Sequence, residues 1–288
     1  MAIRRSRVRG GMLVFIHINK TAGRTVRYIL RSSYGLRHCE VEPWHAAWGG
    51  PPFSTPDLRR LRKVYPKLES IAGHRVTGYV DLEERGTEFR YFTFLREPVA
   101  LCASRFQYQI DYRKKNVEFD EWIAQESFQN AQTKQVGGTE SVDDALRAID
   151  AKGIFVGLTE QFDESLLLLK GLRAGDLDIA YKPVNVAQRN TLAAEVLASP
   201  RMRRAIVAAN SSDLALYEHV TQELYPAQRL EYGASLPEEV ARYQADRLRD
   251  FNRRKLTASR AKQYLIYKPA LTLYRKTSGR GTVGKAPA

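Results

Sequence analysis

The feature of this sequence that most constrains its fold is a short apolar run that passes through a lysine-containing turn directly into a helical pattern. The run MLVFIHI, residues 12–18, is rich in β-forming residues, as expected of a buried strand in a parallel sheet. The turn NKTAGRT follows at once, and apolar residues then recur at helical spacing at Val26, Ile29 and Leu30. Strand, turn and helix in this order predict the start of a βαβ unit.

The turn itself has the composition of an anion-binding loop. The first backbone N–H groups of a helix lack intrahelical acceptors and lie at the positive end of the helix dipole, so they bind anions well. Lys20 adds a positive charge, Thr21 and Thr25 add hydroxyl donors, and Gly23 lets the backbone approach a ligand closely. The turn therefore predicts a site for a phosphate group.

Other strand-like and helical patterns alternate along the chain. A second strand is predicted from 68 that ends at Gly73-His74, and further strands at 89–95 and 153–158. Helices are predicted from 98, from 160, over 200–224 and from 236, and 116–135 is predicted to be a polar helical region. The segment 40–58 is rich in Pro and Gly and is predicted to be an irregular loop. Strands alternating with helices predict an α/β fold with a central parallel sheet flanked by helices.

Composition and charge limit the classes of partner. The chain has 288 residues and is 43% hydrophobic, which is enough for a large core. The net charge of +14 predicts an anionic partner: a nucleotide, a sulfated or carboxylated glycan, a nucleic acid or a lipid surface. Ten Lys or Arg residues and no acidic residue follow Asp250, so the preceding part of the chain carries only about +4. Most of the positive charge therefore lies in the tail.

Cysteine content and the amino terminus suggest a cellular compartment. Cys39 and Cys102 are the two cysteines and do not form a CxxC pair, so neither a disulfide framework nor a zinc cluster is predicted. The apolar run that follows the basic first residues is too short for a secretory signal or a membrane span. We therefore expect a cytoplasmic protein.

A second junction between a strand and a helix carries an arginine. In FTFLREPVALCASRF, residues 92–106, Pro98 suits the first helical turn and Glu97 favours the positive end of the helix. Arg96 precedes this helix, and Ser104 lies about two turns into it. A guanidinium group and a hydroxyl placed in this way can bind the same anion.

The two junctions, taken in order, resemble the 5′-phosphosulfate loop and the 3′-phosphate motif of carbohydrate sulfotransferases of the heparan sulfate 2-O and 6-O type. The loop in that family usually reads close to hIPKTGGTS, and here Asn19 replaces the proline and Ala22 a glycine. Further similarity lies in FQNAQTKQVGG, VGLTEQFDESLLLL and NSSDLALYEHV, so the resemblance spans roughly residues 12–225. It implies a single P-loop-like sulfotransferase domain at 12–231, between a basic segment at 1–11 and a helical, basic extension at 232–288.

The resemblance also implies the cofactor and the residues that bind it. The cofactor would be 3′-phosphoadenosine 5′-phosphosulfate (PAPS), the donor of the sulfuryl group, and no metal would be needed. The residues implied to bind the 5′-phosphosulfate are Lys20, Thr21, Ala22, Gly23, Arg24 and Thr25, and those implied to bind the 3′-phosphate are Arg96 and Ser104. Lys20 would also act in catalysis, by stabilising the oxygen that leaves the sulfur.

A histidine is the expected base for the hydroxyl proton of the acceptor. His74 follows a predicted strand in AGHRVTGY, and the carbohydrate branch of the family has a similar Gly-His pair between the two cofactor motifs. His45 is the alternative base, in a tryptophan-rich loop, and a structural role for His74 is the other interpretation. His17 is predicted to be buried in the first strand, and His38 and His219 to lie at the surface.

The acceptor is expected to be a carbohydrate or a glycolipid. Aromatic platforms for it are Trp44, Trp48 and Tyr79, and the polar residues expected to bind it are Arg75, Gln129, Asn130, Gln132 and Lys134. The alternative for each of these residues is that it packs within the protein or lies on a solvent-exposed helix face. The identity of the acceptor and the oligomeric state stay open.

Two other classes of function compete with the sulfotransferase hypothesis. The first is a catalytically silent protein that binds nucleotides or polyanions through its basic tail; the presence of Lys20, Arg96 and a candidate base argues against it. The second is a nucleotide kinase, which is disfavoured because the Walker pattern GxxxxGK[ST] needs glycines before the lysine, and none lies between Gly11 and Lys20. No nucleic-acid partner is expected.

The tail segment QYLIYKPALTLYRK interleaves apolar residues with lysine and arginine. Such a segment can lie on the anionic, cytoplasmic face of a membrane, and packing against the protein body is the alternative.

Overall fold

The centre of the molecule is a five-stranded parallel sheet with the strand order β2-β3-β1-β4-β5. The structure is a computed structural model that describes residues 11–41, 51–182, 191–246, 248 and 251–277. The strands are β1 (Met12–Ile16), β2 (His38–Glu40), β3 (Ser70–Gly73), β4 (Phe89–Leu95) and β5 (Phe155–Leu158). The predicted α/β fold with a central parallel sheet flanked by helices is confirmed.

The central strand is β1, and its sequence explains its position. All five of its residues are buried, and it pairs with β3 on one side and β4 on the other. Phe15 lies opposite Ala72 in β3 and Phe92 in β4, and the rings of Phe15 and Phe92 stack with centroids 4.8 Å apart. A continuous apolar run is required here because helices or loops cover both faces of a parallel sheet.

The helices account for most of the remaining described residues. They are α1 (Gly23–Tyr34), α2 (Thr55–Val64), α3 (Pro98–Asp111), α4 (Phe119–Ile123), α5 (Ala131–Gly137), α6 (Val142–Lys152), α7 (Phe162–Leu172), α8 (Thr191–Ala198), α9 (Pro200–Ala209), α10 (Ser211–His219), α11 (Tyr225–Tyr232), α12 (Leu236–Asp246), α13 (Arg253–Lys262) and α14 (Lys268–Thr277). Short 3₁₀ turns lie at Gly35–Arg37 and Glu126–Phe128. Wider π-type turns at Val220–Leu224 and Gln263–Tyr267 join α10 to α11 and α13 to α14.

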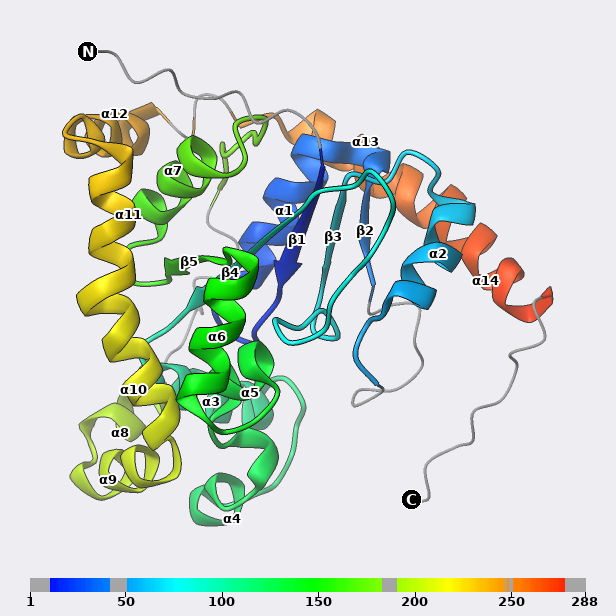
Figure 1. Cartoon of the computed structure of the whole chain (residues 1–288). Coiled ribbons are helices and arrows are strands. Elements are labelled where there is room, and N and C mark those ends of the chain that lie inside the picture. The colour runs from blue at the N-terminus through cyan, green and yellow to red at the C-terminus, as the bar shows by residue number, and fades with distance from the viewer. Residues whose placement is uncertain (1–10, 42–50, 183–190, 247, 249–250, 278–288) are drawn as a thin grey trace.

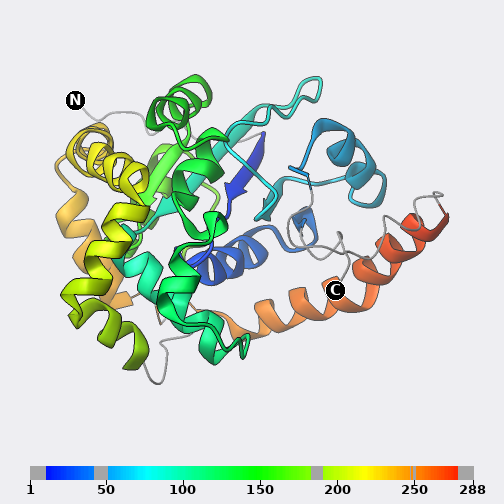
Figure 2. The same ribbon diagram turned by 90° about the horizontal axis from the view of Figure 1, so that it is seen from below.

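The arrangement of the helices defines the end of the sheet where a site can form. The helices α3, α4, α5, α8 and α9 gather beyond the carboxyl ends of the strands, whereas α7, α11 and α12 lie beyond β5 (Figure 1). On one face of the sheet α1 packs against the strands, and α13 crosses over α1 (Figures 1 and 2). Ligands of open α/β sheets bind at the carboxyl ends of the strands, where β1 and β4 both lead into loops before helices.

Several elements differ from the sequence-based expectations. The strand β2 was not predicted, because its three residues are too few to form a periodic pattern. The helix expected over 200–224 is broken at Asn210, where α9 ends and α10 begins. The polar helical region expected over 116–135 contains α4, a 3₁₀ turn and the first part of α5. Residues 42–50 of the expected loop lie outside the described part of the chain.

The carboxyl-terminal helices pack against the body of the protein. The side chains of Leu236 in α12 and Leu256 in α13 are buried in the same apolar core as the sheet. The hydroxyl of Ser259 donates a hydrogen bond to the carbonyl of Arg31 in α1, at 3.3 Å. Apolar residues of the same core therefore also lie beyond residue 231, within the predicted carboxyl-terminal extension. Within the described residues, every helix is too short or too polar to cross a membrane.

Candidate active site

The turn between β1 and α1 has the backbone of a tight loop. Lys20 has a φ of 71° and Ala22 a φ of 60°, both in the left-handed region. A left-handed conformation costs a non-glycine residue about 1–2 kcal/mol, so the surrounding structure must hold it. The buried hydroxyl of Thr21 contributes by donating to the carbonyl of Ile18, at 3.0 Å. The turn ends at Ala22, and the first N–H groups of α1 follow it.

Gly23 is the first residue of α1, and the structure shows why it cannot carry a side chain. A Cβ atom at this position would lie 1.8 Å from Nε2 of His17. The ring of His17 thus occupies the space beside the start of the helix. His17 is 5% exposed, so its predicted burial is confirmed.

Arg96 connects the second predicted anion site to this turn. It follows β4, and its Nη1 donates a hydrogen bond to the carbonyl of Lys20, at 3.2 Å. Burial lowers the pKa of Lys20, and repulsion by Arg96 and Arg24 lowers it further. Three cations therefore converge on one place at the start of a helix, and an anion bound there would relieve their repulsion.

Helix α3 begins directly after Arg96 and is capped by Glu97. The carboxylate of Glu97 accepts hydrogen bonds from the N–H groups of Val99 and Ala100, at 2.9 and 2.6 Å. This cap and Pro98 at the first helical position fix the start of the helix, as the sequence predicted. Ser104 lies two turns further along α3 and is partly exposed.

Tyr108, also in α3, contacts the turn but was not identified from the sequence. Its ring centroid lies 5.0 Å from Nζ of Lys20, within the range of a cation–π interaction. The only signal in the sequence is its spacing: Tyr108 follows Ser104 by four residues and so lies on the same side of α3.

His74 lies against His17, whose ring lies beside Gly23. Its Nδ1 is 2.7 Å from the carbonyl oxygen of His17, and the two imidazole rings stack with centroids 3.9 Å apart. A carbonyl can only accept, so Nδ1 carries the proton and Nε2 is the basic nitrogen of the neutral ring. Burial lowers the pKa of His74 to about 4, although its hydrogen bond to His17 opposes this shift. His74 is therefore neutral near pH 7.

Helix α5 holds both His74 and Arg96 through their backbones. The side-chain amide of Gln135 donates to the carbonyls of His74 and Val76, at 2.7 and 2.8 Å. One turn earlier, the amide of Gln132 accepts from the N–H of Arg96 and donates to its carbonyl, both at 2.9 Å. The structure therefore places Gln132, expected to bind the acceptor, on the backbone of Arg96, and adds Gln135, which the sequence did not indicate.

The amino-terminal ends of α5 and α10 cap each other. The buried carboxylate of Asp213 in α10 accepts from the N–H groups of Gln132 and Thr133, at 3.1 and 2.7 Å. In return, Oδ1 of Asn130 accepts from the N–H groups of Ser212 and Asp213, at 3.1 and 3.3 Å. This network fixes α5, and with it the backbones of Arg96 and His74. The Asn and Asp residues of NSSDLALYEHV were the available signal in the sequence.

The other residues expected to bind the acceptor also contact the protein itself. Gln129 donates to the carbonyl of Ile123, at 2.9 Å. Lys134 pairs with Glu140 at 2.6 Å, and Nε of the buried Arg75 donates to the carbonyl of Pro51, at 2.5 Å. These contacts explain where the side chains lie without any ligand.

The remaining predictions concern the aromatic residues expected to bind the acceptor and the positions of the other histidines. Tyr79 is 41% exposed, while Trp44, His45 and Trp48 lie outside the described residues. The expectation that His38 lies at the surface was wrong, because it is 1% exposed and its Nδ1 lies 3.1 Å from the hydroxyl of Ser70 in β3. It is buried because it belongs to β2, the strand that was not predicted. His219 is partly exposed and its ring pairs with Glu223.

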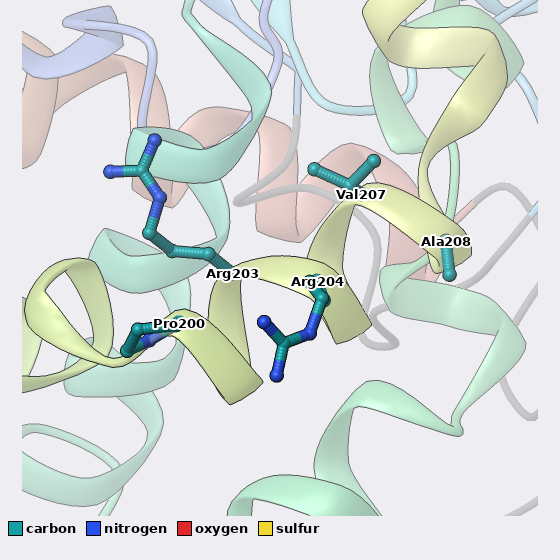
Figure 3. A pocket seen from close by; sticks show the side chains of 5 residues that line it. All are labelled: Pro200, Arg203, Arg204, Val207 and Ala208. Atoms are coloured by element: carbon teal, nitrogen blue, oxygen red, sulfur yellow. The ribbon is translucent and has the colours of Figure 1, made fainter.

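A separate hollow of about 490 Å³ lies along α9. Its lining residues are Pro200, Arg203, Arg204, Val207 and Ala208 (Figure 3). None of them belongs to the turn after β1 or to the junction of β4 and α3, so this hollow does not mark the candidate active site.

Comparison with known proteins finds similarity to sulfotransferases. No family model matches the chain. Galactose-3-O-sulfotransferase 3 from Homo sapiens is 28% identical over 238 residues, which cover 72% of this chain and 54% of that protein. The proteins of the same name from Mus musculus and Bos taurus are 27% and 29% identical, over the same share of this chain and 54% and 55% of their own.

The chain therefore spans about half the length of the curated relatives it matches. These relatives are named as galactose sulfotransferases, so the similarity does not support the heparan sulfate branch to which the motifs were compared. Taken with the fold, the similarity supports a relationship to the carbohydrate sulfotransferases as a group.

Proposed function

We propose that this protein is an O-sulfotransferase that transfers the sulfuryl group of PAPS to a hydroxyl of a carbohydrate or glycolipid. The observation that carries the proposal is the hydrogen bond from Arg96 to the carbonyl of Lys20, which joins the two predicted anion sites. A donor with phosphate groups at both its 3′ and 5′ positions needs two such sites side by side.

The chemistry of these residues fits PAPS. Lys20, Arg24 and the first N–H groups of α1 suit the 5′-phosphosulfate, and Arg96 with Ser104 suits the 3′-phosphate. The hydroxyl of Thr21 is already bonded to Ile18, so its contribution to the loop is to hold the backbone. When bound, PAPS supplies a sulfuryl group attached to a phosphate that can leave.

His74 and Lys20 have separate roles in the transfer. His74 accepts the proton of the acceptor hydroxyl at Nε2, while its Nδ1–H stays bonded to His17. Transfer would form a bond from the hydroxyl oxygen to the sulfur that PAPS supplies, with the phosphate oxygen as the leaving group. Lys20 stabilises the negative charge that develops on that departing oxygen.

Galactose is the first acceptor to test, because the relatives are named for sulfation of galactose at its 3-hydroxyl. Acceptor specificity resides in loops and surface residues that differ between related enzymes, so the acceptor of this chain is a separate question from its donor.

The donor site is tested by calorimetric titration with 3′-phosphoadenosine 5′-phosphate, without magnesium. We expect micromolar or tighter binding to the wild type, and at least tenfold weaker binding to Arg96→Ala, about 1.4 kcal/mol. The control Arg201→Ala removes an exposed arginine of α9 and should bind like the wild type. AMP, which lacks the 3′-phosphate, should bind poorly.

Equal binding of AMP, or no binding of either nucleotide, would contradict the proposal. A catalytically silent protein that binds polyanions through its tail would then be the better account. If the nucleotide binds as expected, loss of transfer in His74→Ala with unchanged nucleotide affinity would identify the base.

A further inference from the structure

Aromatic side chains form a continuous row from the candidate active site along α3 to the surface. Tyr108 and Tyr112 follow Ser104 at intervals of four residues, so all three share one side of the helix. The rings of Tyr108 and Tyr112 stack with centroids 5.3 Å apart and planes 18° apart. Nζ of Lys20 lies 5.0 Å from the Tyr108 ring, so the ring of Tyr108 lies between Tyr112 and Lys20 in this series of contacts.

Tyr112 is unusually exposed for a large aromatic residue. Its side chain is 68% exposed, although it lies at the end of α3 and stacks on a partly buried ring. A flat apolar ring gains free energy when a ligand covers it, so an exposed ring beside a functional site can receive one. A pyranose ring presents one face of C–H groups that matches such a surface.

A small cavity lies at the carboxyl-terminal end of α3, lined by Gln109 of this helix and by residues that follow the helix. It has a volume of about 210 Å³, and the polar residues in its lining are Gln109, Lys115, Asn116 and Gln125. Gln109 is three residues before Tyr112 and is therefore its neighbour on the helix surface. The N–H of Lys115 donates to the carbonyl of Gln109, at 3.1 Å, which folds the chain after α3 back toward the helix.

The polar groups of this cavity suit hydroxyl groups. Amide side chains both donate and accept hydrogen bonds, as sugar hydroxyls do. Gln109 is 5% exposed, and its Oε1 has no hydrogen-bond partner within the described residues. A buried acceptor without a donor costs free energy, about 1–3 kcal/mol, and a hydroxyl that donates to it would remove this cost.

We propose that the carboxyl-terminal end of α3 is a sugar-binding subsite, in which a pyranose ring stacks on Tyr112 and its hydroxyls bind the amides of Gln109 and Asn116 and the ammonium of Lys115. The subsite holds a residue of the acceptor glycan and directs a neighbouring hydroxyl toward Lys20 and His74. The identity of the ligand as an acceptor glycan rests on the proposed function. The binding of a sugar does not require that function to be correct.

The test measures the binding of lactose by saturation-transfer NMR, without any nucleotide. We expect Tyr112→Ala to weaken lactose binding at least fivefold, and Tyr112→Phe to bind within twofold of the wild type because it keeps the ring. Lys115→Met should weaken binding about threefold. Tyr112 and Lys115 are both exposed, so these substitutions should leave the melting temperature unchanged.

Titration of the same variants with 3′-phosphoadenosine 5′-phosphate separates this proposal from the donor site. All of them should bind the nucleotide like the wild type. Unchanged lactose binding by Tyr112→Ala would overturn the proposal. So would weaker nucleotide binding by this variant, since the ring would then stack on adenine. If lactose binds and the nucleotide does not, the subsite stands and the donor proposal fails.

Discussion

At the scale of single residues, the site depends on the packing of two imidazole rings. The ring of His17 occupies the space beside Gly23 and stacks on His74, whose Nδ1 bonds to the backbone of His17. The same burial that positions His74 disfavours its charged form, because desolvation lowers the pKa of a histidine. A histidine held neutral in this way is available as a proton acceptor throughout the physiological pH range.

This arrangement predicts a pH dependence with a definite sign. His74 has a pKa of about 4 in the folded protein, against about 6.5 when unfolded, so between these values only the unfolded state binds the proton. Stability contributed by His74 should be fully present above pH 6.5 and should be lost as the pH falls toward 4, by roughly 1–3 kcal/mol. Urea unfolding of wild type and His74→Asn at pH 7, 5.5 and 4.5 measures this.

We expect the stability of His74→Asn to fall less steeply with decreasing pH than that of the wild type. The variant keeps His17 and His38, whose pKa values are also lowered by burial, so part of the slope should remain. Identical slopes in the two proteins would show that His74 is not held neutral by the fold.

At the scale of secondary-structure elements, α5 sets the distance between the proposed base and the proposed 3′-phosphate site. Gln132 binds the backbone of Arg96, and Gln135, one turn later, binds the backbone of His74. The reciprocal caps with α10 keep this short helix in place. A helix of seven residues is too short to be stable alone, so these tertiary bonds are what maintain it.

Two matched substitutions in α5 should separate its two roles. Gln135→Met keeps the length of the side chain but removes the donor to His74, and should lower kcat about tenfold while nucleotide affinity stays within twofold. Gln132→Met should instead weaken nucleotide binding, because it releases the backbone of Arg96. Initial-rate kinetics and calorimetry distinguish the two. The same effect of both variants on both quantities would mean that α5 supports only the general fold.

At the scale of the whole molecule, the carboxyl-terminal helices combine positive charge with exposed apolar side chains. Tyr264, Leu265 and Ile266 in the π-type turn and Leu273 in α14 are each more than half exposed. Figure 2 shows α14 running away from the rest of the protein. With ten basic residues and no acidic residue after Asp250, this region is complementary to an anionic lipid surface.

Flotation of the full chain with liposomes tests this interaction. We expect binding to phosphatidylcholine vesicles that contain about 30% phosphatidylserine, and much weaker binding to vesicles of phosphatidylcholine alone. Replacing Leu265 and Ile266 by Ser should reduce flotation severalfold. Leu230→Ser is the matched control, because this leucine of α11 is 84% exposed but lies outside the basic region. Equal flotation of all three proteins would exclude a membrane role for these helices.

The sequence alone was sufficient for features that depend on neighbouring residues. The buried strands β1 and β4, the tight turn after β1, and the capped start of α3 at Glu97 and Pro98 all follow from local composition. These features determined the fold class and the positions of Lys20 and Arg96 at the starts of helices. The three-residue strand β2 escaped prediction because a strand so short has no pattern of its own, and the burial of His38 was missed with it.

Only the tertiary structure decided which of these residues meet. Lys20 and Arg96 are 76 positions apart, and His74 and Gln135 are 61 apart, so no local pattern could pair them. The stacking of His17 on His74, the contact of Tyr108 with Lys20, and the use of Gln132 to hold Arg96 likewise depend on the order of the strands and the packing of α3 and α5. Local chemistry determines which side chains are available in this protein, and long-range packing determines which of them act together.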